Sequence, residues 1–342
     1  MANSNLKVSI LIPSYNQSKY LIAAIDSALQ QDYENLEVIV SDNCSTDDTL
    51  THVSRYTADN RFKFYRNEEN IGMGANAHKL FSYAKGDFAL FLPGDDLLLC
   101  NEFISDAVRI IETYPSIVAV FGKNKTLFDD TGKMAESNCN YPAEYMTGKD
   151  VFLNFTKRRL GVLSCLFNRN LVQNIGFSET KALSGDFEFI LRLCLHGNIG
   201  FINKHTAAWR RHEENYSRMV DIETLINNTA YFEVPYRTAI QSNAFDKCTL
   251  DKWLKEMRTS YFFSRLIKLH YLAPELIPEF EEAIKQYNAE IYKSVTGDIR
   301  LKLFRLISRF SSLTYLIFKY VLNQGPFIRE LYSFKRKATE KL

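Results

Sequence analysis

The stretch Lys7-Val-Ser-Ile-Leu-Ile-Pro13, followed by Ser14-Tyr-Asn-Gln-Ser18, decides the fold prediction. The first part is an apolar run ended by proline, which is typical of a strand buried in a parallel sheet. The second part is a turn with a helix N-cap, and residues 19–31 continue with a helical pattern. A strand, a turn and a helix in this order indicate the first unit of an α/β sheet.

Strand and helix patterns alternate from this unit to residue 122, which predicts a mostly parallel sheet with right-handed crossovers. Further strands are expected at residues 36–40, 62–66, 87–92, 117–122 and 162–168, with one or two more in 198–209. Further helices are expected at residues 74–84, 101–113 and 185–196. Residues 123–149 lose the regularity and are expected to form loops and edge strands.

The pattern becomes helical from about residue 221 onward, with helices expected at 222–242, 250–270, 275–294 and 299–322. Neither an internal repeat nor a low-complexity linker interrupts the chain. We therefore expect two domains, an α/β catalytic domain at 1–220 and a helical C-terminal region at 221–342.

The composition is that of a folded globular protein, with 46% hydrophobic and 24% charged residues. A net charge of +2 over 342 residues argues against a strongly basic nucleic-acid binder. Six scattered cysteines without a Cys-x-x-Cys motif predict free thiols in a reducing compartment, here the cytoplasm. The N-terminus does not have the pattern of a signal peptide, and the longest uncharged stretch of the apolar tail, residues 310–318, is too short to span a membrane.

Polar side chains follow two of the expected strands. Asp42 and Asn43 come directly after one strand, and Asp95 and Asp96 follow another. Ligands of open α/β sheets bind at the carboxyl ends of the strands. Asp42 and Asn43 suit a base or a ribose, and Asp95 and Asp96 suit a metal ion. The two groups together indicate a nucleoside-diphosphate substrate.

Together with residues 67–76, 184–192 and 209–217, these segments resemble the family-2 glycosyltransferases, inverting enzymes with the GT-A fold. The resemblance covers about residues 7–217. It implies an α/β, Rossmann-like catalytic domain that moves one sugar from a UDP- or dTDP-sugar. The implied acceptor is a glycan or lipid-linked glycan in cell-surface polysaccharide synthesis.

The resemblance also implies a donor site. Pro13 and Tyr15 are expected to contact the donor. Tyr15 is expected to stack on a pyrimidine base, although a tyrosine that fills the turn is the alternative. Asp42 and Asn43 correspond to the paired aspartates of the family. Asn43 replaces the second aspartate, and its amide oxygen can still accept a hydrogen bond from a pyrimidine N–H.

Two further segments complete the expected donor site. Asn70, Gly72 and Asn76 match the family's donor loop, where glycine allows the backbone to approach the ligand. In the segment that closes the catalytic domain, Arg211 or its neighbour Arg210 is expected to contact the diphosphate, and Arg211 is preferred.

A divalent ion, Mn²⁺ or Mg²⁺, is expected at Asp95, Asp96 and His212, with Asp95 also in contact with the donor. The family usually writes this motif Asp-x-Asp-Asp, and Pro93 replaces its first aspartate. Two alternatives remain open at this stage: the aspartates cap the next helix, or the histidine is structural.

Asp186 takes the position of the general base that removes a proton from the acceptor hydroxyl. Many relatives carry a glutamate directly before it, where this chain has Gly185. Glu188 is the nearest rival. An aspartate at a helix start is also a common cap, which is the structural alternative.

The C-terminal tail is basic, because residues 297–342 carry ten Lys/Arg against three Asp/Glu. Apolar residues recur there at helical spacing from Leu303 to Tyr320, so the helix either packs on the protein or lies in a lipid interface. The charge favours an anionic membrane surface and hence a peripheral protein on the inner face of the cell membrane.

Three rival functions differ in sequence signals. A processive synthase would carry membrane-spanning helices and a Gln-x-x-Arg-Trp segment, and the sequence shows neither. A sugar-phosphate nucleotidyltransferase would carry a glycine-rich loop after the first strand, where this chain has Ser14-Tyr-Asn-Gln. A catalytically inactive glycan-binding or scaffold protein stays open because of Pro93. Donor sugar, acceptor, linkage and oligomeric state have no sequence signal.

Overall fold

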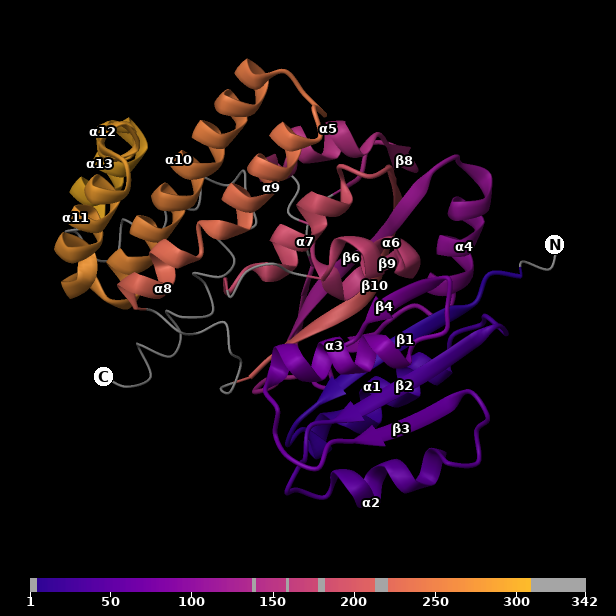
Figure 1. The fold of residues 1–342 in the computed structure, drawn as a ribbon. Coiled ribbons are helices and arrows are strands. Elements are labelled where there is room, and N and C mark those ends of the chain that lie inside the picture. The colour runs from indigo at the N-terminus through magenta and orange to yellow at the C-terminus, as the bar shows by residue number, and fades with distance from the viewer. Residues whose placement is uncertain (1–4, 137–139, 158–159, 178–181, 213–220, 309–342) are drawn as a thin grey trace. The chain divides into compact units, whose positions relative to one another are not determined.

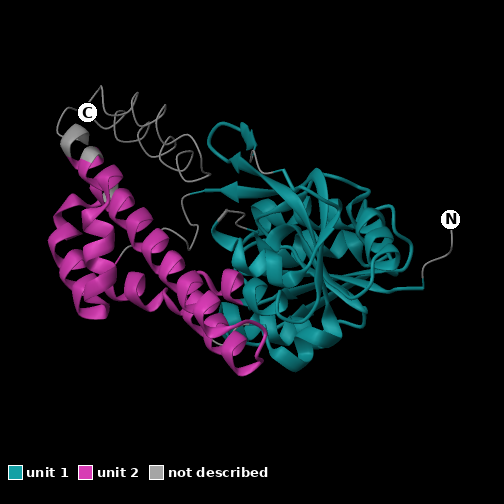
Figure 2. Ribbon diagram, turned by 90° about the horizontal axis from the view of Figure 1, so that it is seen from above, with its two compact units in different colours: residues 1–179, 189–215 teal, residues 180–188, 216–342 magenta. Residues whose placement is uncertain are grey.

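The computed structural model describes residues 5–136, 140–157, 160–177, 182–212 and 221–308. The chain divides into two compact units, residues 1–179 with 189–215, and residues 180–188 with 216–342 (Figure 2). The first unit contains the sheet and its covering helices, and the second is helical (Figure 1). The fold is α/β with a helical C-terminal region, as the sequence predicts.

The described strands form one sheet in the order β3-β2-β1-β4-β9-β6-β10-β5, with β7 beside β6 and β8 beside β10. Their bounds are β1 Val8–Ser14, β2 Leu36–Asp42, β3 Phe62–Arg66, β4 Phe88–Phe91, β5 Leu97–Leu98, β6 Ile117–Phe128, β7 Met134–Glu136, β8 Tyr145–Met146, β9 Cys165–Asn168 and β10 Asn198–Arg211. The four strands β1 to β4 run parallel, whereas β9 is antiparallel to both of its neighbours.

Helices connect and cover these strands. Those of the first unit are α1 Ser18–Leu29, α2 Thr49–Val53, α3 Met73–Tyr83, α4 Phe103–Thr113, α5 Gly148–Leu153 and α6 Arg169–Ile175, with 3-10 turns η1 Ser54–Tyr56, η2 Phe155–Lys157 and η3 Val162–Ser164. Helix α7 Gly185–Leu193 begins in the second unit and ends in the first. The second unit holds α8 Ile222–Asn227, α9 Ala230–Gln241, α10 Lys247–Leu272, η5 Pro274–Leu276, α11 Ile277–Tyr287, α12 Ala289–Gly297 and α13 Ile299–Ser308.

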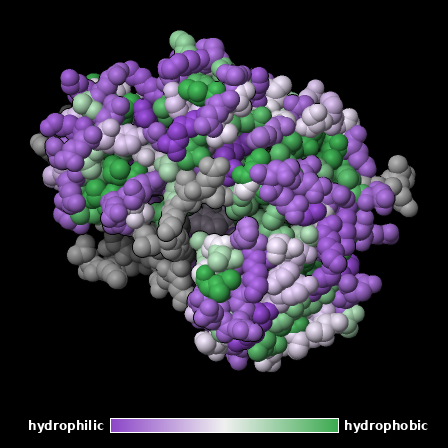
Figure 3. All heavy atoms as spheres, viewed as in Figure 1, coloured by the Kyte–Doolittle hydropathy of each residue, from purple (hydrophilic) through white to green (hydrophobic). Residues whose placement is uncertain are grey.

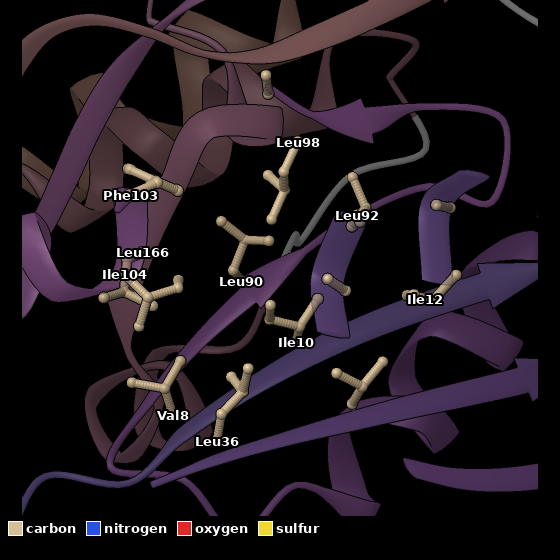
Figure 4. Close-up of a cluster of buried hydrophobic side chains, with 14 of the residues drawn as sticks. Val8, Ile10, Ile12, Leu36, Leu90, Leu92, Leu98, Phe103, Ile104 and Leu166 are labelled. Atoms are coloured by element: carbon tan, nitrogen blue, oxygen red, sulfur yellow. The ribbon is translucent and has the colours of Figure 1, made fainter. Parts of the chain in front are cut away.

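Both faces of the central strands are covered, which explains their unbroken apolar runs. On one face, Val8, Ile10 and Ile12 of β1 belong to a buried cluster with residues of α1 and α4 (Figure 4). On the other face, the rings of Phe91 in β4 and Phe167 in β9 stack 6.0 Å apart. Alternation of side chains along each strand supplies both faces at once.

A buried carboxylate joins the amino-terminal ends of the strands. Glu37 of β2 accepts hydrogen bonds from Ser9 Oγ at 2.7 Å, Lys63 Nζ at 2.6 Å and the Lys85 backbone N–H at 2.7 Å. Burial alone would raise the pKa of Glu37, but these hydrogen bonds lower it overall. The charge is therefore satisfied inside the sheet, and the carboxylate is held in its ionised form.

Several expected elements differ in extent from the observed ones. The region expected as loops and edge strands begins instead with a continuation of β6 to Phe128, followed by the short strands β7 and β8. The strand expected at 162–168 starts as the 3-10 turn η3. The one or two strands expected in 198–209 are a single strand, β10, which continues to Arg211.

The helix expected at 222–242 is two helices, separated at Asn228 and Thr229. The one expected at 275–294 is also two, because Asn288 leaves the helical conformation and its side chain caps α12 by accepting from Ile291 N–H. An asparagine side chain competes for backbone groups, so a helical spacing of apolar residues does not reveal such a break.

The start of the tail packs inside the second unit. Leu301 and Phe304 of α13 are buried, and Arg305 pairs with Glu281 of α11. This part of the expected amphipathic helix is therefore core packing. Residues 309–342, which include the rest of the helix expected at 299–322 and most of the basic side chains, lie outside the described residues.

Across the described part of the chain, no helix combines the length and apolar character needed to cross a membrane. Polar residues cover much of the visible face in Figure 3, with apolar residues in separate patches. The five cysteines among the described residues are free, as expected: Cys44, Cys100, Cys165, Cys194 and Cys248.

Candidate active site

The carboxyl ends of β1, β2 and β4 are joined by backbone hydrogen bonds. Asn43 N–H donates to Ser14 O at 2.9 Å, and Gly94 N–H donates to Pro13 O at 3.1 Å. A Cβ atom on Gly94 would lie 2.7 Å from Gln17 Oε1 and 3.2 Å from Pro13 O, so a larger residue would have to displace the Gln17 side chain. Pro13 thereby ties the turn after β1 to the segment that carries the acidic pair.

Asp42 ends β2 and is completely buried. Its Oδ1 accepts from the backbone N–H of Ser45 at 3.0 Å and from the Ser45 hydroxyl. Its Oδ2 has no hydrogen-bond donor among the described residues, although Arg66 Nη1 lies 3.2 Å away as an ion-pair partner. This oxygen is thus able to accept from a ligand N–H.

Tyr15 follows β1 on the turn to α1 and is 45% exposed. The turn is held without it: Asn16 adopts a φ of 52°, its N–H donates to Ser45 Oγ at 2.9 Å, and its Oδ1 accepts from Thr46 N–H at 2.8 Å. A tyrosine that fills the turn would be buried there. The exposure of the ring leaves it available for stacking.

A network of side-chain amides supports the expected donor loop. Asn67 Nδ2 donates to Asn43 Oδ1 and to Asn76 Oδ1, each at 3.0 Å. Ser41 Oγ donates to Asn76 Oδ1 at 2.7 Å, and Asn43 Nδ2 donates to Asn70 Oδ1 at 2.8 Å. Asn43, Asn67 and Asn76 are buried, so the network fixes the loop to the end of β2.

This network changes the interpretation of Asn43. Its Oδ1 accepts from Asn67 Nδ2 at 3.0 Å and from Ile71 N–H at 3.1 Å. Both lone pairs are occupied, so in this conformation the oxygen expected to accept from a base holds the loop instead. Asn70 Oδ1 also accepts from Gly72 N–H at 2.9 Å, and Gly72 adopts the positive φ of 84° that favours glycine.

The acidic pair lies between β4 and β5, and β10 approaches it. Strand β5 pairs antiparallel with β10, so the residues that precede it meet the end of β10. Asp96 Oδ1 accepts from the backbone N–H of Arg210 at 2.6 Å, and Asp95 Oδ2 lies 2.9 Å from His212 Nε2. The alternative that the aspartates cap the next helix is wrong, because α4 begins only at Phe103.

Asp96 is buried, and burial together with the neighbouring charge of Asp95 raises the pKa of Asp96 well above its ordinary value. The backbone N–H of Arg210 opposes this shift only in part. Two adjacent carboxylates in a buried setting repel each other when both are ionised, and a bound cation relieves that repulsion.

Asp95, Asp96 and His212 carry carboxylate and imidazole groups, which are donor types that divalent cations bind. No group of three or more His, Cys, Asp or Glu side chains within the described ranges is arranged to hold a metal ion. Asp95, Asp96 and His212 therefore offer an incomplete set, with Asp95 and His212 already bonded to each other. Mg²⁺ typically takes one or two carboxylates and completes its shell with water and substrate phosphates.

Arg210, rather than Arg211, is the arginine beside the acidic pair. Arg210 Nε donates to Asp95 O at 2.9 Å. Arg211 instead has its guanidinium 6.0 Å from the centre of the Phe128 ring. Successive side chains of a strand point to opposite faces, so only one of two neighbouring arginines can face the pair.

Two residues near the acidic pair carry no recognisable sequence signal. The Tyr20 ring stacks on His212 with centroids 5.1 Å apart, and the Arg210 guanidinium lies 4.8 Å from the same ring. Tyr20 Oη donates to Asp129 Oδ2 at 2.9 Å, and Asp129 also pairs with Arg210 at 3.4 Å. Together they brace the end of β10, and neither belongs to a motif.

Asp186 belongs to the second unit, in the first turn of α7. Burial raises the pKa of Asp186 to about 6, and the N–H of Phe187 lowers it in part. A carboxylate with such a pKa is a better proton acceptor near neutral pH than an ordinary aspartate. The rival Glu188 is completely buried.

Comparisons with known proteins agree with this picture. A family model described as "Glycosyl transferase family 2" matches residues 9–173. The Escherichia coli protein named UDP-Glc:alpha-D-GlcNAc-diphosphoundecaprenol beta-1,3-glucosyltransferase WfgD is 38% identical over 198 residues, 57% of this chain and 73% of WfgD. Chondroitin synthase of Escherichia coli is 30% identical over 230 residues, and the match covers 63% of this chain but only 31% of that protein.

Solved structures resemble the whole chain. S. aureus TarS 1–349 in complex with UDP-GlcNAc has a TM-score of 0.66 at 21% identity, covering 97% of this chain and 92% of that one. A mannosyltransferase from Pyrobaculum calidifontis, in complex with GDP-Man and Mn²⁺, has a TM-score of 0.52 at 16% identity, covering 94% and 87%. At these identities the likeness establishes the fold alone.

Proposed function

Since this chain belongs to glycosyltransferase family 2, we propose that it transfers a single sugar, with inversion, from a UDP- or dTDP-sugar to a glycan or lipid-linked glycan. The pathway would be cell-surface polysaccharide synthesis. The name of WfgD states a UDP-Glc donor and a diphosphoundecaprenol acceptor, and a Campylobacter jejuni relative at 31% identity also has an undecaprenol-linked acceptor in its name. These names support a nucleotide-sugar donor and a lipid-linked acceptor.

The observation that carries the proposal is the shared edge formed by β1, β2 and β4. Along it stand an exposed ring, Tyr15, a buried carboxylate oxygen of Asp42 without a hydrogen-bond donor among the described residues, and the acidic pair Asp95 and Asp96. A nucleoside diphosphate needs these three features: a stacking surface, an acceptor for a base N–H, and a site for charge at the phosphates.

We assign the proton transfer to Asp186. Its carboxylate takes the proton of the acceptor hydroxyl while that oxygen forms a bond to the anomeric carbon. The bond between the anomeric carbon and the phosphate oxygen breaks, and its electron pair leaves with the nucleoside diphosphate. One displacement at that carbon inverts its configuration.

Asp95, Asp96 and His212 would hold a divalent cation in this proposal, with Mn²⁺ and Mg²⁺ as the candidates. When bound, such an ion offsets the charge that builds on the leaving diphosphate. Arg210 stands beside the pair and adds a positive charge there through its guanidinium.

A panel of UDP- and dTDP-sugars, incubated with the protein with and without Mn²⁺, tests the proposal by release of nucleoside diphosphate. We expect release from one donor or a few, stimulated by the metal and by a polyprenyl-diphosphate sugar acceptor. The rival function, an inactive glycan-binding or scaffold protein motivated by Pro93, predicts no release from any donor. A product with retained anomeric configuration, read by NMR, would contradict the mechanism.

We also propose that the chain associates peripherally with an anionic membrane on its cytoplasmic side. The support is the basic charge of residues 297–342 and the lipid-linked acceptors named for relatives. Because Leu301 and Phe304 are buried in the second unit, the proposal now concerns the segment after Ser308.

A further inference from the structure

We propose that Asn228, which lies between helices α8 and α9, is a positioning residue for Asp186. Its side chain holds the segment that carries this carboxylate. The inference rests on the proposed function, since it concerns the residue assigned there as the base. It gives the break between α8 and α9 a role in the reaction.

The contact that carries the inference is a pair of hydrogen bonds. Ser184 N–H donates to Asn228 Oδ1 at 2.8 Å, and Asn228 Nδ2 donates to Ser184 Oγ at 3.1 Å. Asn228 is 3% exposed, and Ser184 precedes Asp186 by two residues. A buried amide thus binds both the backbone and the side chain of the segment just before the carboxylate.

The amide is itself held in place. Tyr261 Oη lies 3.4 Å from Asn228 Nδ2 and donates to Leu225 O at 2.7 Å. Tyr261 is 1% exposed and comes from α10. Asn228 lies between α8 and α9, and residues of α8 and α10 are thus bonded to it or to each other beside it.

The residue after Asp186 is fixed from the same side. The Phe187 ring makes an edge contact with Tyr231 of α9, with centroids 5.8 Å apart. Ser184 before the carboxylate and Phe187 after it are thus both held by residues of the α8–α9 region. Such a clamp limits the movement of the backbone that presents Asp186.

A proton acceptor must stand within hydrogen-bond reach of the attacking hydroxyl, and a displacement of about 1 Å can reduce the rate about a hundredfold. A purely structural role for Asn228 is the alternative. In that case its loss would lower stability without a specific effect on the chemical step. Turnover and donor binding, measured separately, distinguish the two.

The test compares Asn228→Ala with Thr229→Ala in the full chain. Thr229 lies in the same break and is also buried, but its hydroxyl donates to Ile226 O at 2.8 Å rather than to Ser184. With the nucleotide sugar selected by the donor panel, we expect Asn228→Ala to lower kcat about tenfold to a hundredfold. KM for the donor and calorimetric affinity for UDP should stay within about twofold, and Thr229→Ala should keep the wild-type kcat.

Ser184→Ala removes the hydroxyl contact and leaves the backbone bond, so it should lower kcat by a smaller factor, about threefold. It also keeps the test valid if Asn228→Ala does not fold. The proposal is overturned if the kcat of Asn228→Ala equals that of Thr229→Ala, or if the affinity of Asn228→Ala for UDP falls as much as its kcat. If Asn228→Ala does not fold, the proposal is overturned when Ser184→Ala has the wild-type kcat. Asp186→Asn separates the two proposals: full turnover in that variant refutes the assigned base, whereas its loss beside an unaffected Asn228→Ala refutes only the positioning role.

Discussion

Replacing Asp186 with Asn should make the protein slower and more stable at the same time. The substitution keeps the shape of the side chain and removes its basicity. We expect turnover to fall about a hundredfold or more, the usual range for loss of a general base. Donor affinity should hold, because a base acts on the acceptor hydroxyl and not on the nucleotide.

The gain in stability follows from the raised pKa. Burial raises the pKa of Asp186 from 3.8 to about 6. A pKa that differs by one between the folded and unfolded states corresponds to about 1.4 kcal/mol, so the ionised carboxylate costs the folded state up to about 3 kcal/mol above pH 6. The folded state binds the proton more tightly than the unfolded state. The cost of ionisation is therefore absent below the unfolded pKa, grows as pH rises, and is fully present above the folded pKa. Asn carries no charge and avoids the cost.

Two measurements check this prediction. Urea unfolding at pH 8 should give Asp186→Asn a higher free energy of unfolding than wild type, and the difference should shrink toward pH 4. In the pH profile of kcat, the wild-type rate should fall below pH 6 as the carboxylate takes up a proton.

Asp246→Asn is the matched control. Asp246 caps α10 by accepting from Thr249 N–H at 2.8 Å, and asparagine caps equally well. The control should therefore keep wild-type turnover. Because the hydrogen bonds from Thr249 lower the pKa of Asp246, any change in its stability at pH 8 should be a loss, opposite in sign to the gain expected for Asp186→Asn. If Asp186→Asn keeps wild-type turnover, or shows no pH-dependent gain in stability beyond the control, the reasoning about this carboxylate is wrong.

Four further predictions concern other parts of the chain. Replacing Asp95 and Asp96 with Ala should abolish Mn²⁺-stimulated donor release while near-UV circular dichroism stays native; full activity of that variant in excess chelator would contradict the metal assignment. Tyr20→Leu should weaken Mn²⁺ stimulation about tenfold, whereas Tyr20→Phe, which keeps the stacked ring, should lose less; equal effects would show that stacking is irrelevant. Glu37→Gln should lower the free energy of unfolding by about 1–3 kcal/mol at pH 7, and by less at pH 3.5. Because the pKa of Glu37 is lowered in the folded state, its ionised carboxylate stabilises the fold above the unfolded glutamate pKa, and this stabilisation is lost as pH falls through the folded pKa. A chain that ends at Ser308 should keep donor release and lose flotation with phosphatidylserine vesicles at low salt; undiminished flotation would place membrane binding elsewhere.

The sequence by itself determined the architecture of the first unit. Strands buried on both faces have continuous apolar runs, so β1 to β4 and a mostly parallel sheet could be predicted, although the spatial order of the strands could not. It also determined which residues stand at the strand ends. Asp42, Asn43, Asp95 and Asp96 fall there because the chain leaves the sheet at those points.

Only the tertiary structure decided what those side chains do. Arg210 rather than Arg211 faces the acidic pair, because the register of β10 against β5 sets which side chain points there. Tyr20 reaches His212 although they are far apart in sequence. No local pattern encodes such pairings.

The tertiary structure also decided the roles of two asparagines, Asn43 and Asn228, which the sequence did not reveal. Asn43 is expected to accept from a base, and the structure occupies its oxygen with Asn67 and Ile71. Asn228 is hidden inside an apparently continuous helical pattern, and the structure bonds it to Ser184, 44 residues earlier. An amide side chain donates and accepts equally well in many places, so its partner depends on which segments the fold brings within about 3 Å of it.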